Sequence, residues 1–376
     1  MNFTLTEDQL ILQEMVRNFT VQTIEPFADQ IDQTGKLPNA FIKKFANIGL
    51  LGMTVPRRYG GSEATNLSCI LAIEQVAYSG TGAWWLLAFN NSIPQCIANF
   101  GSETIKNKFL KTFCNGDGYA SIQFTEEETG SNSNVLITRA IPDGNDYIIY
   151  GMKRFSTFGS RDGYAIVFAK DETDSCTAFL VQKNCSGYSV EKTWKLMGAG
   201  GIETSDICFH DLRVPAMNIL GQKTKGLDIL FDWIALEKIQ QSIASVGIAQ
   251  AALDEAVNYT KSRKSGGKSI SNMQGIKWML ADMQCQLTAA RWLTYRTAYL
   301  CDQNAAEWRL EAASTKLFVT KTALEIVDTA RQIHGCYGYT RDFKIERLYR
   351  AIAGASGIGT SLEINRSIVG NWVITR

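Results

Sequence analysis

The chain has 376 residues, a formal net charge of +1 and 45% hydrophobic residues, values typical of a globular protein large enough for a buried site. This charge gives no support for a nucleic-acid partner, and no apolar run is long enough to predict a membrane span. The first residues, MNFTLTEDQL, lack the basic and apolar segments of a secretion signal, and the cysteines show no CxxC spacing. We therefore expect a cytoplasmic protein with reduced thiols.

Residues 1–117 are predicted to form an N-terminal helical domain. Thr6 and Gln9 form a capping-box pattern before the first apolar helical run. Further runs of helical period follow at 37–48, 67–77, 82–100 and 102–114, and Pro94 is expected to interrupt the third of these. Trp84 and Trp85 are either ordinary core aromatics or bulky walls that shorten a substrate pocket.

Residues 118–220 are predicted to form a central β domain, either a small barrel or a sandwich. The indication is a series of short segments rich in β-branched and aromatic residues and separated by turn residues. The predicted strands are 119–124, 146–150, 165–169, 178–181, 188–191 and 204–214.

Residues 221–376 are predicted to form a C-terminal helical bundle. Helical period returns at 226–263, 272–300 and 305–334, and a last helix begins near Leu362. One acidic residue, Glu237, interrupts the apolar stripe of the long run 226–263. A carboxylate there is either solvated at the edge of the helix or buried with a function, because charged side chains are rarely buried unpaired.

Several common active-site patterns are absent. The chain has no GxGxxG dinucleotide fingerprint and no P-loop, and it contains two histidines, His210 and His334. The histidine count gives little support for zinc hydrolysis or a serine triad, so we expect no metal site.

Five segments in a fixed order carry the strongest functional signal. They are TEEETGS (125–131), YGMKRFST (150–157), MG to FHDLRVP (197–215), ALDEA to LADM (252–283) and QIHG to ERLYR (332–350). Together they resemble the acyl-CoA dehydrogenase family over nearly the whole chain. The predicted order of helical domain, β domain and helical bundle agrees with this resemblance.

The resemblance implies an α+β multidomain fold with a C-terminal four-helix bundle, bound FAD, and a homodimer or homotetramer. It also implies oxidation of an acyl thioester between its α and β carbons. A carboxylate takes the α proton and the β hydrogen leaves as hydride to the flavin, which carries the redox chemistry. The electron acceptor after that step is an electron-transferring flavoprotein or oxygen.

The resemblance also implies which residues bind FAD. Arg263 matches an arginine that binds the pyrophosphate of the partner subunit's cofactor, and Thr157 matches a threonine that bonds near flavin N5. Taken singly, each residue is more simply explained by an ordinary structural role, Thr157 as a strand hydroxyl and Arg263 as part of a surface ion pair. The complete cofactor set consists of Thr125, Ser131, Phe155, Thr157, Arg263, Gln274, Gln332, Gly335 and Ser361.

The sequence departs from the family where most members carry the catalytic glutamate. The matching run, residues 355–366, reads ASGIGTSLEINR and places Gly359 or Ile358 at the position of the acid. Neither residue can accept a proton. Glu363 falls in the following helix and is not assigned the role.

Glu237 is therefore predicted to be the base, because isovaleryl-CoA and prolyl-carrier-protein dehydrogenases place it on this helix. The base becomes useful where a dry environment adjusts its pKa. The main-chain N–H near Gly359 can still polarise the thioester carbonyl, since that contact needs no side chain. The predicted substrate-contacting residues are Ser131, Lys238, Gly359, Trp84 and Trp85.

We thus expect an FAD-dependent dehydrogenase or oxidase of a small, branched or cyclic acyl thioester, carried by CoA or by a carrier protein in biosynthesis. Two alternatives remain at this stage. One is a flavin monooxygenase or oxidase of other substrates on the same fold. The other is a non-catalytic member that keeps the fold as a scaffold.

Overall fold

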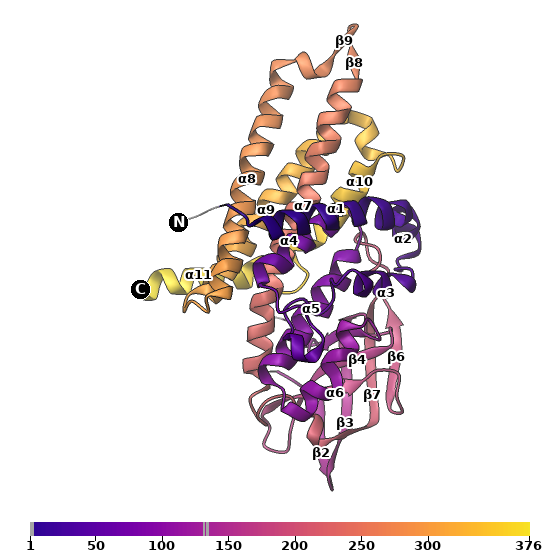
Figure 1. Ribbon diagram of the computed structural model, residues 1–376, viewed down its shortest axis with the longest axis vertical. Helices are drawn as coiled ribbons and strands as arrows, with labels where there is room; N and C mark the ends of the chain where they lie inside the picture. Colours follow the sequence, from indigo (N-terminus) through magenta and orange to yellow (C-terminus); the bar gives the residue numbers. More distant parts are fainter. Residues whose placement is uncertain (1–3, 131, 133–134) are drawn as a thin grey trace.

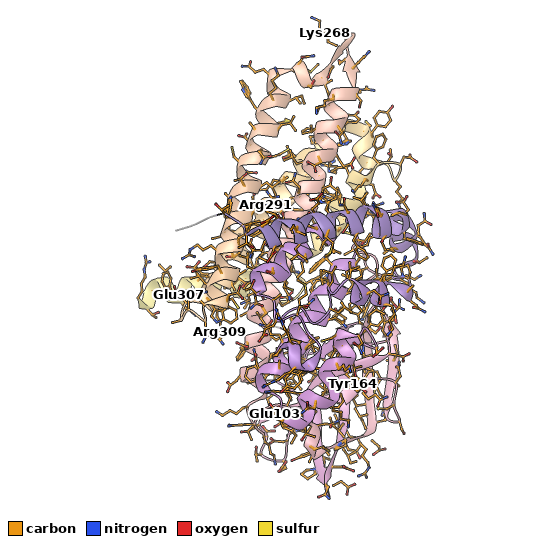
Figure 2. The ribbon with its side chains drawn as sticks, viewed as in Figure 1. Glu103, Tyr164, Lys268, Arg291, Glu307 and Arg309 are labelled. Atoms are coloured by element: carbon orange, nitrogen blue, oxygen red, sulfur yellow. The ribbon has the colours of Figure 1, made fainter. Side chains whose placement is uncertain are left out.

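The computed structural model describes residues 4–130, 132 and 135–376. The molecule is elongated, with the β domain at one end and the paired helices α7 and α8 projecting at the other (Figure 1). The N-terminal helices lie between these ends and pack on both. Side chains fill the space between the layers (Figure 2), as where Tyr164 of the sheet meets Phe109 of a covering helix at 5.0 Å between ring centroids.

The N-terminal domain is helical, as predicted. Its helices are α1 (Glu7–Phe19), α2 (Ala28–Thr34), α3 (Ala40–Asn47), α4 (Asn66–Ala77), α5 (Ala83–Phe100) and α6 (Glu103–Cys114). Thr6 and Gln9 form the predicted capping box. The expected interruption at Pro94 was wrong, because α5 continues through it. Proline removes one hydrogen bond from a helix. Pro94 is nevertheless buried within the domain, and the helix around it is unbroken.

The central domain is one sheet of seven strands. The strands are β1 (Tyr119–Gln123), β2 (Arg139–Asp143), β3 (Asp146–Thr157), β4 (Gly163–Lys170), β5 (Cys176–Gln182), β6 (Tyr188–Thr193) and β7 (Thr204–Pro215). A single residue pair, Arg139 with Lys170, joins the β1-β4-β5 group to the β2-β3-β7-β6 group. The sheet is therefore sandwich-like in its division, although hydrogen bonds connect all seven strands.

The sequence prediction missed β2 and the second half of β3. Most of β2 is exposed, so it lacks the buried alternation that identifies a strand. β3 was predicted to end at Tyr150, but it continues to Thr157 through two irregularities in its pairing with β7. Such bulges interrupt the two-residue alternation and re-aim the side chains beyond them.

The C-terminal domain contains α7 (Gly226–Ser262), α8 (Gln274–Asp302), α9 (Trp308–Ile333), α10 (Lys344–Ala353) and α11 (Leu362–Thr375). The helix α10 was not predicted, yet it packs on α7 and α9. A two-stranded hairpin of β8 (Lys264–Ser265) and β9 (Lys268–Ser269) joins α7 to α8. No helix in the described part of the chain is long and apolar enough to cross a membrane.

Helix α7 holds the domains together, because α4, α5, α8, α9 and α10 all pack against it. Gly247 marks its closest approach to α4. A Cβ atom added there would lie 2.3 Å from the main-chain oxygen of Glu74. The missing side chain thus permits the helix contact that joins the N-terminal domain to the bundle.

We predict that Gly247→Val destabilises the protein by about 3 kcal/mol or more, because a rigid backbone atom blocks the new side chain. The matched control is Gly370→Ala, a helical glycine whose added Cβ would meet nothing within 4 Å. Denaturant unfolding of both variants checks the prediction. Equal midpoints for the two variants would contradict it.

Candidate active site

Glu237 is buried in the middle of the molecule without a hydrogen-bond partner. Its side chain lies on α7 and is 3% exposed. Neither carboxylate oxygen has a hydrogen-bond partner among the described residues, and the same holds for Oε1 of Gln241, one turn further along the same face. A folded protein normally satisfies such atoms, so this face of α7 has the polar character of a ligand site.

The carboxylate occupies space that a side chain at position 359 would need. A Cβ atom added to Gly359 would lie 2.4 Å from Oε1 and 2.6 Å from Oε2 of Glu237. Gly359 also has φ +72°, a conformation that favours glycine. Glu237 and Gly359 are 122 positions apart in the sequence, yet the fold brings the acid directly to the turn that lacks one.

Two lysines lie beside this acid. Nζ of the fully buried Lys316, on α9, is 3.9 Å from Oε2 of Glu237 and donates a hydrogen bond to the main-chain oxygen of Ile358 at 2.8 Å. Lys238 follows Glu237 on α7 and is also buried. The ion pair is too long for a hydrogen bond but close enough for strong attraction in a dry interior.

Burial decides the direction of the pKa shifts in this cluster. Loss of solvent raises the pKa of Glu237 above the usual carboxyl range, and the charges of Lys316 and Lys238 oppose the shift. Burial lowers the pKa of Lys238 to about 8, with Glu237 opposing. A carboxylate with a raised pKa is a stronger proton acceptor, which suits a general base.

An aromatic wall connects the turn before Glu237 to the β domain. Trp233 contacts Phe89 of α5 at 5.6 Å, and Phe89 contacts Phe158, which follows Thr157, at 6.3 Å between ring centroids. Trp85 joins the wall through Phe89 at 5.4 Å and stacks on Trp84. Both tryptophans are therefore buried core aromatics, and they belong to the cluster that lies between the acid and Thr157.

A strained bend in β3 exposes Phe155 beside this region. Phe155 has φ +52° at the second irregularity of the strand, and its side chain is 53% exposed. Trp194 stacks on it at 5.2 Å. Buried Asp206 accepts hydrogen bonds from the Phe155 N–H at 3.2 Å and from Nε1 of Trp194 at 2.8 Å. Left-handed backbone at a non-glycine residue often marks a functional site.

The loop after β1 is held by a buried ion pair. Nζ of Lys153 lies 2.6 Å from Oε1 of Glu126, which also accepts the N–H of Thr138 at 3.0 Å. The main-chain oxygen of half-buried Thr125 accepts the N–H of Arg154 at 2.7 Å. The predicted cofactor residue Ser131 lies outside the described residues. The ion pair explains how both ends of this loop are fixed to the sheet.

A second group of predicted cofactor residues lies at the far end of α7. Arg263 ends the helix, and its guanidinium lies 5.8 Å from the ring centroid of Tyr337 in the turn that begins at Gly335. Gln274 begins α8 at the same end, and Gln332 lies in the last turn of α9. All four of these predicted residues are exposed.

The two groups are too far apart for one compact site. Glu237 and Arg263 are separated by about 39 Å along the axis of α7, at 1.5 Å per residue. In Figure 1, β3, which carries Phe155 and Thr157, lies towards one end of the molecule, and the β8–β9 hairpin that follows Arg263 lies at the other. Ser361 lies with the first group, since it caps α11 just after the Gly359 turn.

The residues at both ends fit an anionic dinucleotide. Arg263 forms no ion pair with another described residue, so its charge is available to a phosphate. Gly335 has φ +60° with open space around it, which lets a ligand approach the backbone. At the other end, exposed Phe155 offers a ring face and Thr157 a hydroxyl with no described hydrogen bond. The ring face and hydroxyl at one end suit the ring of one such cofactor, and the cation and open backbone at the other end suit the phosphates of a second cofactor.

Sequence reasoning missed Lys316, although a signal was present. Lys316 interrupts an apolar stripe on α9, where Ala312, Ala313, Val319 and Ala323 are all buried. Glu237 interrupts the stripe of α7 in the same way. Two opposite charges on the apolar faces of neighbouring helices are a pattern that predicts a buried ion pair.

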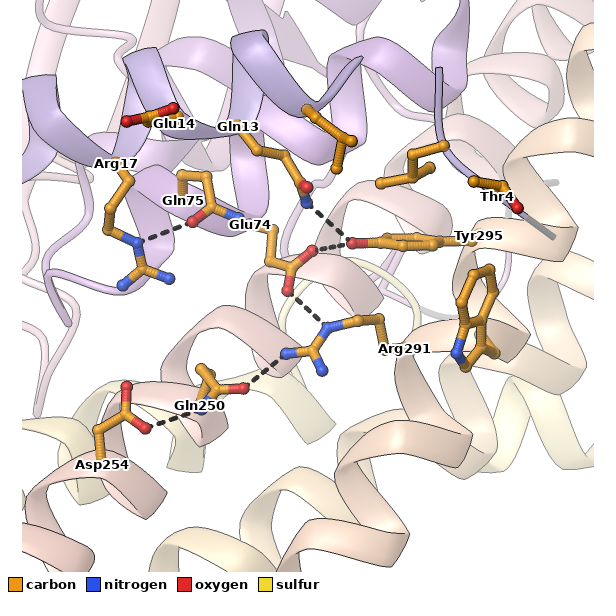
Figure 3. A pocket seen from close by; sticks show the side chains of 13 residues that line it. Thr4, Gln13, Glu14, Arg17, Glu74, Gln75, Gln250, Asp254, Arg291 and Tyr295 are labelled. Atoms are coloured by element: carbon orange, nitrogen blue, oxygen red, sulfur yellow. Dashed lines mark hydrogen bonds and ion pairs between the residues drawn. The ribbon is translucent and has the colours of Figure 1, made fainter. Parts of the chain in front are cut away.

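A cavity of about 750 Å³ lies elsewhere, among α1, α4, α7 and α8 (Figure 3). Buried Glu74 is at its centre and accepts hydrogen bonds from Nε of Arg291 at 2.8 Å and from the hydroxyl of Tyr295. Arg291 also donates to Gln250, which in turn donates to Asp254. These polar groups thus bond one another across α4, α7 and α8, whereas the carboxylate of Glu237 has no hydrogen-bond partner among the described residues.

We predict that Gly359→Ala lowers stability by about 1–3 kcal/mol, because it adds a methyl group against Glu237 and forces alanine into left-handed backbone. The matched control in the same turn is Gly357→Ala, whose added Cβ would meet nothing within 4 Å. Denaturant midpoints of the two variants provide the measurement. A Gly359→Ala variant as stable as its control would show that the carboxylate does not occupy this space.

Solved structures of similar proteins cover the whole chain. The butyryl-CoA dehydrogenase of Megasphaera elsdenii is 29% identical, with a TM-score of 0.96 and 100% of both chains covered. The prolyl acyl carrier protein oxidase AnaB is 26% identical, with a TM-score of 0.92, covering 98% of this chain and 100% of the other. Structures of this fold include an FAD complex.

Comparison of sequences points to the same group of proteins as comparison of structures. The acryloyl-CoA reductase (NADH) of Anaerotignum propionicum is 33% identical over 382 aligned positions, with 100% of this chain and 97% of that protein covered. Models of the N-terminal, middle and C-terminal domains of acyl-CoA dehydrogenase match residues 6–117, 121–212 and 224–374. The chain is therefore a member of the acyl-CoA dehydrogenase family, a family of FAD-dependent oxidoreductases.

Proposed function

We propose that this protein is an FAD-dependent α,β-dehydrogenase of a small acyl-CoA thioester, with Glu237 as the base. One observation carries the proposal. The carboxylate of Glu237 lies without a hydrogen-bond partner in the space that a side chain at Gly359 would fill, in the turn where Gly359 or Ile358 matches the position of the usual acid. An acid missing from one turn is thus replaced in space by an acid from a distant helix.

The chemistry requires a dry carboxylate beside an activated α carbon. Glu237 takes the α proton onto a carboxylate oxygen, and the electrons of the broken C–H bond form the new double bond. The N–H of Gly359 polarises the thioester oxygen and so makes the α C–H more acidic. Bound FAD supplies the acceptor for the β hydrogen, which leaves as hydride. Burial keeps water from the base and strengthens each of these contacts.

The separation of the two cofactor groups supports an assembly of at least two chains. Thr125, Phe155, Thr157 and Ser361 would hold the ring end of one FAD, whereas Arg263, Gln274, Gln332 and Gly335 would hold the phosphates and adenosine of the partner's FAD. The distance of about 39 Å from Glu237 to Arg263 is the reason, because one bound cofactor cannot serve both ends of α7. We propose a homodimer or homotetramer on this ground.

The substrate proposal rests on the aromatic wall and on the relatives. Trp84 and Trp85 pack into the cluster between Glu237 and Thr157, which supports a short acyl group, including a branched or cyclic one. The name of the more similar relative, an acryloyl-CoA reductase, supports CoA as the carrier. The prolyl acyl carrier protein oxidase supports the alternative, a carrier-protein thioester in a biosynthetic step.

The carrier is tested by offering the same acyl group in two forms, as the CoA thioester and loaded on a carrier protein. We expect anaerobic bleaching of the flavin by the CoA form. Bleaching by the carrier-protein form alone would overturn the choice of CoA. Reoxidation of the bleached enzyme by oxygen, compared with an electron-transferring flavoprotein, then distinguishes an oxidase from a dehydrogenase.

We predict that Glu237→Gln slows anaerobic bleaching by acyl-CoA about 10²- to 10⁴-fold while FAD remains bound, because the variant lacks the proton acceptor. The matched control is Glu363→Gln. Glu363 lies close to the same turn in sequence, but it is exposed and paired with Arg366 at 2.6 Å. We expect the control to bleach at the wild-type rate. A Glu237→Gln variant that bleaches as fast as wild type would show that another group is the base.

We predict that Arg263→Met lowers FAD affinity roughly tenfold or more, because a charge-assisted bond to phosphate is lost. The control is Lys264→Met, which removes an exposed charge from the next position. The ratio of flavin absorbance to protein absorbance after gel filtration gives the measurement. Equal flavin retention in the two variants would contradict the role of Arg263.

A further inference from the structure

Lys316 is a buried lysine that has no role in the proposed reaction as described above. It lies in the middle of α9 with a fully buried side chain. Burying an ammonium group costs several kcal/mol unless it is paired and hydrogen-bonded, so its contacts should account for it. Only two described groups serve this purpose, the main-chain oxygen of Ile358 and the carboxylate of Glu237.

The hydrogen bond to Ile358 determines the direction of the next N–H. In a trans peptide the C=O of one residue and the N–H of the next point in opposite directions. Lys316 donates to the oxygen of Ile358 at 2.8 Å, so the N–H of Gly359 points away from Lys316. That N–H has no hydrogen-bond partner among the described residues. It is therefore a free donor whose orientation depends on the lysine.

The ion pair with Lys316 favours the ionised form of Glu237. Lys316 on α9 and Lys238 on α7 are the charged groups of the described chain that act on Glu237. The helix α5 and the turn 354–361 contribute no acidic or basic side chain. Burial raises the pKa of Glu237, and the charges of the two lysines oppose that increase. Without the charge of Lys316, only Lys238 would oppose it.

We propose that Lys316 is a positioning residue that prepares both partners of the reaction at once. Its hydrogen bond directs the Gly359 N–H at the thioester oxygen, and its charge holds Glu237 in the form that accepts a proton. The inference rests on the proposed function, because it assigns Lys316 a role at the same site. It adds that the donor and the base are controlled by a single side chain from a third helix.

Two variants separate the two roles. Lys316→Met removes the charge and the hydrogen-bond donor from a site that accepts an apolar chain of similar length. Lys316→Gln removes the charge but keeps a polar donor near Ile358. The control is Lys344→Met, which breaks the ion pair of Lys344, the first residue of α10, with Glu25 at 2.6 Å. All variants are assayed as holoenzymes with FAD bound.

The first measurement is the pH dependence of flavin bleaching by acyl-CoA. The base works when ionised, so the rate rises as pH rises through the pKa of Glu237. Without the nearby positive charge this pKa increases, and we expect the rising limb to move up by about one pH unit in both Lys316 variants. The control should keep the wild-type limb. A wild-type limb in both Lys316 variants overturns the electrostatic role.

The second measurement needs no turnover. A 3-thia acyl-CoA has sulfur at the β position, so it cannot lose hydride, and infrared difference spectra report how strongly its bound carbonyl is polarised. We expect the lowering of the carbonyl frequency to be lost in Lys316→Met and largely kept in Lys316→Gln. The bleaching rate of Lys316→Met at its optimum pH should fall about tenfold to hundredfold, less than the roughly 10²- to 10³-fold loss for removal of an oxyanion donor, because the N–H is misdirected but still present. Unchanged carbonyl frequencies in Lys316→Met overturn the positioning role.

The outcomes also distinguish this inference from the proposed function. If Glu237→Gln abolishes bleaching while both Lys316 variants behave as wild type, the base assignment stands and the role of Lys316 fails. If Glu237→Gln bleaches normally, the proposed base fails whatever the lysine variants show.

Discussion

The structure depends on a buried carboxylate that no described side chain or backbone group hydrogen-bonds. Glu237 lies against the α carbon of Gly359, and the nearest cation, Lys316, stays 3.9 Å away. Such an arrangement is costly in a packed core, because a carboxylate loses its solvation on burial, and it is found most often at functional sites. The absence of a side chain at position 359 is the complementary condition, since any Cβ there would displace the acid. The site is thus defined as much by a missing side chain as by the one present.

Helix α7 connects this local arrangement to the rest of the molecule. Its first third carries the acid, its middle contacts the N-terminal domain at Gly247, and its last residues lead to Arg263. A rigid helix of this length keeps the acid and the arginine at a fixed separation. The same element that positions the proposed base therefore also separates the two sets of predicted cofactor residues, and in the proposed assembly it would link catalysis in one chain to cofactor binding in another.

The β domain contributes to the proposed site through the irregular pairing of β3 with β7. Regular pairing of β3 with β7 would turn alternate side chains to opposite faces, but the bulge before Ser156 places Phe155 in left-handed backbone and turns its ring to solvent. Asp206 stabilises this bend from the neighbouring strand. A buried ion pair between Lys153 and Glu126 then fixes the adjoining loop. Strain and buried charge thus occur together at the edge of the proposed site.

The sequence alone determined the order of the domains, the helical and strand periods, and the family, because these depend on local patterns of apolar and turn residues. It also pointed to Glu237, since one acid interrupted a long apolar stripe while the late turn lacked an acid. Only the tertiary structure showed that this acid meets Gly359, that Lys316 lies beside both, and that the predicted cofactor residues form two distant groups. Contacts between positions more than a hundred residues apart leave no local pattern. They arise from the packing of helices, and the distance between two packed residues cannot be obtained from their positions along the sequence.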